Sequence, residues 1–70
     1  MTTRRYHQRT KAEAAAAAVR EQEAFIAERG NSRSGYIRHY GATGVPRATA
    51  VAIWTSDQAR LDQLRSEAGL

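Results

Sequence analysis

Apolar residues recur with a helical period in the first long segment of the chain, Thr10 to Arg29. They lie three, four or seven positions apart and so form one stripe along a helix: Ala15, Ala18, Val19, Phe25 and Ile26. Thr10 and Glu13 make a capping-box pattern at the start, and Gly30 with Asn31 supplies a stop at the end. We therefore expect a helix over 10–29.

A shorter helix is expected next. Ser32 or Ser34 can accept a hydrogen bond from the first turn of a helix that continues to about Tyr40. Tyr36, Ile37 and Tyr40 would then lie on its buried side. Gly41 and Gly44 are expected to end it.

The segment from Val45 to Trp54 supports two interpretations. Pro46 suits the first turn of a helix, which favours a helix from about Val45. However, Val51, Ile53 and Trp54 favour strands, and Thr49, Val51 and Ile53 alternate with their neighbours. A strand near 48–55 is therefore the alternative.

The last segment, Thr55 to Leu70, is again helical in pattern. Thr55 and Gln58 make a second capping-box pattern, and Leu61, Leu64 and Ala68 follow at helical spacing. The fold class expected is mostly α, a small helix-turn-helix-type domain of about four helices. The alternative is a ribbon-helix-helix-like fold with the strand near 48–55.

The size of the chain limits its core. With 70 residues, much of its apolar content in alanine and no cysteine, it buries little and has no disulfide. We expect one small domain over 10–70, and either a homodimer or a protein partner that completes the core.

Charge is distributed unevenly along the chain. Arg4, Arg5, Arg9 and Lys11 give residues 1–11 a charge of +4, and Arg33, Arg38 and Arg47 give residues 30–54 a charge of +3, with no acid in either segment. Residues 1–9 have no helical or strand period and are interpreted as a flexible basic arm. Such an arm and a basic surface are typical of proteins that bind a polyanion, so the expected partner is double-stranded DNA.

Ala42 to Ala50, with the sequence Ala-Thr-Gly-Val-Pro-Arg-Ala-Thr-Ala, resembles the turn and the start of the recognition helix in bacterial helix-turn-helix regulators, especially the IclR-like group. In that family this turn opens the helix that enters the major groove. The resemblance implies that Arg47 and Thr49 lie at the base-facing end of that helix.

A second resemblance concerns ribbon-helix-helix repressors. Ala27 to Arg38 is similar to their helix–helix junction, where a Gly-x-Ser-Arg-Ser turn holds a DNA phosphate on backbone N–H groups. Ala50 to Gly69 separately resembles the ribbon and first helix of that family. This resemblance implies the strand near 48–55.

The residues needed for catalysis are scarce. There is no acid between Arg29 and Asp57, and His39 among arginines suits a phosphate contact better than a general base. We expect no enzyme activity, no cofactor, no metal site and no membrane span, and a cytoplasmic, nucleoid-associated location.

The function expected is sequence-specific DNA binding, by a transcriptional regulator or recombination accessory factor of bacterial or phage origin. The candidate DNA-binding residues are Arg4, Arg5, Arg9, Lys11, Arg33, Arg38, Arg47 and Thr49. The alternative is a small adaptor or inhibitor that binds a host protein through its Ala-rich helix.

Overall fold

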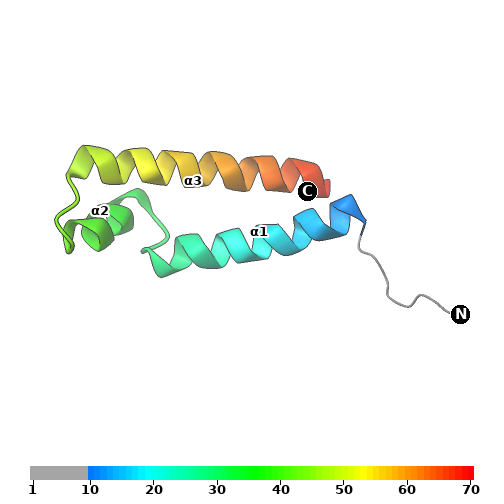
Figure 1. Cartoon of the computed structure of the whole chain (residues 1–70), viewed down its shortest axis with the longest axis horizontal. Helices are drawn as coiled ribbons and strands as arrows, with labels where there is room; N and C mark the ends of the chain where they lie inside the picture. Colours follow the sequence, from blue (N-terminus) through cyan, green and yellow to red (C-terminus); the bar gives the residue numbers. More distant parts are fainter. Residues whose placement is uncertain (1–9) are drawn as a thin grey trace, which may run out of the picture.

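The structure, a computed structural model, describes residues 10–70, which form three helices. They are α1 (Lys11–Glu28), α2 (Arg33–Gly41) and α3 (Arg47–Ala68). The two long helices, α1 and α3, run side by side in opposite directions, and the short α2 lies at the end where the chain passes from one to the other (Figure 1). The expected arm, residues 1–9, lies outside the described residues.

Helix α1 begins and ends as its sequence predicts. The Thr10 Oγ1 accepts from the Glu13 N–H at 3.1 Å, and the Glu13 carboxylate accepts from the Thr10 N–H at 2.9 Å, which completes the capping box. At the other end, Gly30 (φ +99°) and Asn31 (φ +56°) take left-handed conformations. The Asn31 N–H then returns to the Ile26 carbonyl at 3.0 Å, which satisfies a carbonyl of the last turn.

Helix α2 is capped by Ser32, whose Oγ accepts from the Gly35 N–H at 2.9 Å. It ends at Gly41, and the chain reverses through Gly44 (φ +89°) while the Val45 N–H donates to the Tyr40 carbonyl at 3.1 Å. Both boundaries follow the sequence expectation.

Helix α3 confirms the helical interpretation of residues 45–54, but it extends further than the sequence predicts. The strand alternative is wrong, because residues 48–55 are helical and residues 10–70 contain no strand. The expected division at Thr55 is also wrong, because the Thr55 hydroxyl donates back to the Val51 carbonyl at 3.0 Å within one continuous helix. The domain therefore has three helices, not four.

The physical reason lies in packing. Ala50 is fully buried, and Trp54 packs against the core four residues later, so a helix places both on the same side. Burial of this stripe outweighs the strand preference of the β-branched residues, which is weak and depends on context. Neighbouring residues set the boundaries of α3: Pro46 precedes its first residue, and Gly69 (φ +78°) ends it.

The core is thin and is made by all three helices. Its buried members are Val19, Ile26, Tyr36, Leu61 and Leu64. Tyr36 is fully buried and donates its hydroxyl hydrogen to the Asp57 carboxylate at 2.7 Å, while its ring meets Trp54 edge-on at 5.0 Å. Gln22 of α1 donates to the backbone carbonyl of the same Asp57 at 3.2 Å. Asp57 thus joins α3 to both other helices.

The backbone segments at the corner between α1 and α2 lie very close together. A Cβ atom added to Gly35 would lie 2.5 Å from the carbonyl oxygen of Gly30, and one added to Gly30 would lie 2.5 Å from the Cα of Gly35. Two glycines therefore allow two backbone segments to touch where no side chain fits.

Candidate nucleic-acid interface

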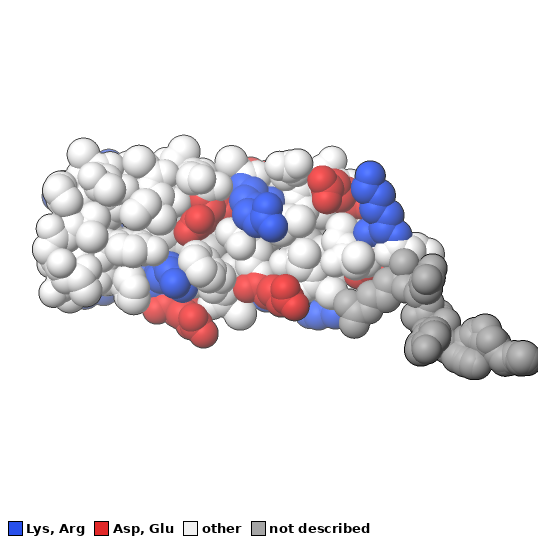
Figure 2. All heavy atoms as spheres, in the orientation of Figure 1, with Lys and Arg blue, Asp and Glu red and all other residues white. Residues whose placement is uncertain are grey.

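One end of the molecule is built from a segment that contains no acidic residues. Residues 30–56, which include α2, the turn after it and the first ten residues of α3, contain no Asp or Glu. We call this part the acid-free end. On the face shown in Figure 2, no acidic side chain lies over α2 or the first turns of α3, whereas charges of both signs lie over α1 and the rest of α3.

The structure brings three of the candidate arginines to the acid-free end. Arg33 is the first residue of α2, Arg38 lies in the middle of α2, and Arg47 is the first residue of α3. All three are exposed, and none forms an ion pair with a side chain of residues 10–70. Their positive charges are therefore directed to solvent and to any anion that approaches this end.

The starts of α2 and α3 add to the positive potential. Neither helix has an acid in its first turn. The N–H groups in the first turn of a helix have no partner within the helix, and Pro46 has no side-chain acceptor that could cap those of α3. A helix start with free N–H groups carries partial positive charge, which suits a phosphate.

Thr49 is exposed in the first turn of α3, two residues after Arg47. Residues two apart on a helix are separated by about 200° around its axis. A duplex that approaches one side of α3 therefore contacts one of them directly, and the longer Arg47 is the stronger candidate. The other exposed residues of this half of α3 are small and neutral, and include Ala48, Ala52 and Ser56.

The remaining candidates lie elsewhere. Lys11 is the first residue of α1, at the opposite end of the molecule from α2 (Figure 1). About 27 Å of α1 separates these ends, so Lys11 does not belong to the same local surface. Arg4, Arg5 and Arg9 lie outside the described residues.

Two polar groups near the acid-free end have structural roles instead. Arg29 donates to the Tyr40 hydroxyl at 3.0 Å and to the Phe25 carbonyl at 2.9 Å, and its guanidinium lies 3.4 Å from the centre of the Phe25 ring. The sequence placed Phe25 in the buried stripe, but it is 40% exposed, and the Arg29 guanidinium covers its ring. Burial and the hydrogen bond to Asp57 raise the pKa of Tyr36 well above its ordinary value, so this hydroxyl remains a donor.

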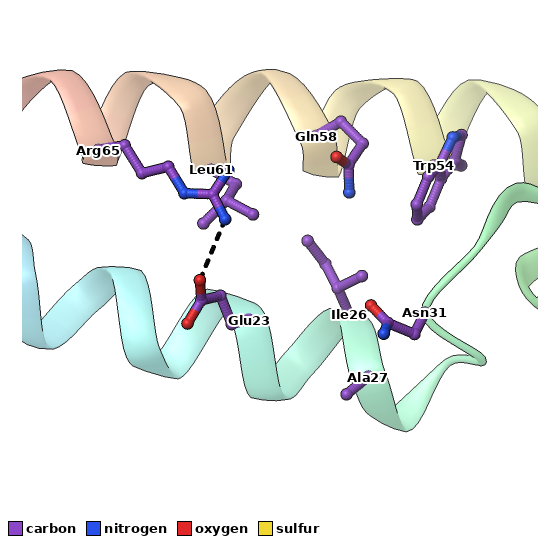
Figure 3. Close-up of a pocket in the computed structure, with 8 residues that line it drawn as sticks. All are labelled: Glu23, Ile26, Ala27, Asn31, Trp54, Gln58, Leu61 and Arg65. Carbon is purple, nitrogen blue, oxygen red and sulfur yellow. Dashed lines mark hydrogen bonds and ion pairs between the residues drawn. The ribbon is translucent and has the colours of Figure 1, made fainter. Parts of the chain in front are cut away.

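A groove between α1 and α3 was not anticipated. It has a volume of about 470 Å³ and is lined by Glu23, Ile26, Ala27, Asn31, Trp54, Gln58, Leu61 and Arg65 (Figure 3). Glu23 and Arg65 form an ion pair across it at 3.1 Å. No residue of α2 lines it. The residues on the α1 side, from Glu23 to Asn31, are 23 to 42 positions from those on α3, from Trp54 to Arg65, so no local pattern identifies them.

Residues 10–70 contain no group of three or more His, Asp or Glu side chains placed to hold a metal ion. None of the three helices combines the length and the hydropathy that a membrane crossing needs.

Comparison with protein-family models, with curated proteins and with solved structures finds no match to this chain. The two family resemblances of the sequence therefore stay predictions.

Proposed function

We propose that this protein binds double-stranded DNA through the acid-free end, as a small transcriptional regulator or recombination accessory factor in the cytoplasm of a bacterium or its phage. The observation that carries the proposal is the position of Arg33, Arg38 and Arg47. These exposed arginines share one end of the molecule, built from residues 30–56 without Asp or Glu, and none of them forms an ion pair with residues 10–70. Such an end attracts the phosphate backbone before any sequence is read.

The helix-turn-helix resemblance suggests how the contacts divide. Helix α2, the turn at 42–46 and the start of α3 follow the order of that motif. Arg33 and Arg38 on α2 would contact phosphates and set the orientation, while Arg47 would reach a guanine edge, which accepts a bidentate arginine. The small neutral side chains beyond Arg47 would allow the start of α3 to approach the major groove closely.

Fluorescence anisotropy of a labelled duplex, measured across a salt series, tests this proposal. Each phosphate contact contributes about −0.9 to the slope of log affinity against log salt. Replacing Arg33 or Arg38 by Ala should weaken binding to all sequences and lower the magnitude of the slope by about 0.9. Arg47→Ala should mainly reduce the preference for a selected site over random duplex.

Arg60→Ala is the matched control. Arg60 is also exposed and also makes no ion pair with residues 10–70, but it lies in the half of α3 that carries acids. It should leave both affinity and slope close to those of the unchanged protein. Equal losses from Arg60→Ala and Arg38→Ala would mean that net charge alone drives binding. Failure of the full chain to bind any duplex at low salt would exclude the proposal.

A second candidate function is binding of a protein partner through α1. It is favoured by the outer side of this helix, where the exposed Ala14 and Ala24 and the half-buried Ala17 accompany the 40% exposed Phe25. Small residues at i, i+3 and i+10 allow another helix to approach closely. A nuclease-resistant complex that survives R33A/R38A/R47A but is lost in Ala17→Glu would favour this candidate over DNA binding.

A further inference from the structure

We propose that the groove between α1 and α3 binds the same groove of a second copy, with the two copies related by a two-fold axis parallel to the long helices. The proposed dimer does not depend on DNA binding, because the residues that line the groove do not include Arg33, Arg38 or Arg47.

The groove exposes part of the core that the three helices of residues 10–70 build. Ile26 and Leu61 form its floor, and the half-buried Trp54 lies across it from Ala27 and Asn31 (Figure 3). No residue of α2 lines this side, so the groove stays open. A second copy's pair of long helices, laid over this groove, would form a second layer and give a four-helix arrangement. Helices of this kind usually bury their apolar sides in that way.

The charges of the groove select one orientation. Glu23 of α1 and Arg65 of α3 lie at the same level, because they pair at 3.1 Å. If the axis is parallel to the helices, each copy's α1 lies over the other's α3, so each Glu23 faces the partner copy's Arg65. The four charges then alternate around a square. If the axis instead crosses the helices at this level, Glu23 faces Glu23 and Arg65 faces Arg65, which is repulsive.

The same orientation suits the apolar contacts. It places Trp54 of one copy over the end of the other copy's α1 side that carries Ala27 and Asn31, because these residues line the same end of the groove as Trp54. Ala27 is exposed and small, so it leaves space for the indole ring. A buried tryptophan at the centre of an interface is a frequent source of binding energy.

The area that the two copies can bury limits the affinity of the dimer. Helix α1 is about 27 Å long and a pair of helices is about 20 Å wide, so the two copies together would bury roughly 1,100 Å². This is at the low end for specific complexes. We therefore expect a dissociation constant in the micromolar range rather than an obligate dimer.

Sedimentation equilibrium of the full chain and of two charge variants tests the orientation. Glu23→Arg places arginine opposite Arg65, and Arg65→Glu places glutamate opposite Glu23, so each variant alone should dimerise at least about tenfold more weakly. An equimolar mixture of the two should form a heterodimer, because opposite charges then face each other across the interface even though the pair within each copy is repulsive. Controls are Glu21→Arg and Arg60→Glu, the same charge changes at exposed positions outside the groove.

A second pair of variants tests the surface without changing the ion pair. Ala27→Arg should abolish dimerisation, whereas Ala24→Arg, at an exposed position of α1 outside the groove, should not. Circular dichroism confirms that each variant is folded. An unchanged protein that stays monomeric at every concentration, or Ala27→Arg and Ala24→Arg that dimerise equally, would overturn the inference. So would a failure of the two charge variants to pair while each remains helical.

Spin labels at Ala42 report the orientation directly, because the chain has no cysteine and Ala42→Cys would provide one exposed site in the turn after α2. The parallel axis puts both turns at the same end, about 20 Å apart, whereas a crossing axis separates them by more than about 30 Å, the length of α3. A long distance would overturn the proposed orientation. These dimerisation measurements contain no DNA, so a negative result in them does not affect the DNA-binding proposal. That proposal is tested separately by the salt titration.

Discussion

Replacing Gly35 by Ala should destabilise the protein, although the same change in an ordinary helix is stabilising. Gly35 is the third residue of α2, where alanine would normally gain up to about 1 kcal/mol from its helix propensity. Here the new Cβ would lie 2.5, 2.6 and 2.7 Å from the O, C and Cα atoms of Gly30. All three are backbone atoms, so no side chain can rotate away.

The magnitude follows from what must move. A gap of several tenths of an ångström has to open between α1 and α2, and overpacking of this kind costs about 1–3 kcal/mol. Ser32, between the two glycines, would lose the geometry of its bond to the Gly35 N–H, a cap worth about 1 kcal/mol. After the propensity gain is subtracted, about 1–3 kcal/mol of the free energy of unfolding should be lost. In a domain of this size that corresponds to a fall in Tm of roughly 4–24 °C.

Urea and thermal unfolding followed by circular dichroism measure this change. Gly41→Ala is the control, because Gly41 is the last residue of the same helix and nothing lies within 4 Å of its added Cβ. That variant should be as stable as the original or up to about 1 kcal/mol more stable. If Gly35→Ala is also neutral or stabilising, the close contact of the two backbones does not limit the fold, and the reasoning is refuted.

Three further predictions concern hydrogen bonds. Tyr36→Phe removes the donor to Asp57 and should lower the free energy of unfolding by about 1–3 kcal/mol in urea titrations, whereas Thr10→Ala, which removes the α1 cap, should lower it by about 1 kcal/mol. If Tyr36→Phe is neutral, the bond to Asp57 contributes nothing to stability; if Thr10→Ala is neutral, the start of α1 is frayed. Because the pKa of Tyr36 is raised in the folded protein, its contribution is present below about pH 10 and is lost as the pH rises above that value. Stability should therefore fall above about pH 10, and less steeply in Tyr36→Phe; identical slopes would contradict this.

Local signals in the sequence predicted most helix boundaries. The cap at Thr10, the stop at Gly30 and the cap at Ser32 each depend on residues within three or four positions, so the sequence contains all that determines them. The division of α3 failed for the opposite reason. Thr55 could cap a new helix or donate back to a carbonyl within a continuous one. Which of these occurs depends on the packing of Ala50 and Trp54 against the core, and no local sequence pattern indicates that packing.

The candidate site shows the same division. The acid-free stretch with its arginines is visible in the composition, and the structure adds that Arg33, Arg38 and Arg47 share one end while Lys11 does not. The exposure of Phe25 could not be predicted, because its apolar type and helical position both suit the core. The pairing of Glu23 with Arg65 across 42 positions likewise needs the fold itself.

The continuity of α3 fixes an angular relation along its length. Arg47 and Arg65 belong to one helix, so about 27 Å of rise and a constant 100° per residue connect the acid-free end to the groove. Adding one residue between Asp57 and Leu61 would turn the two parts by 100° relative to each other, whereas adding seven would return them to within about 20°. The phase of this single helix, and not a flexible joint, therefore determines in which direction one part of the molecule points when the other is held.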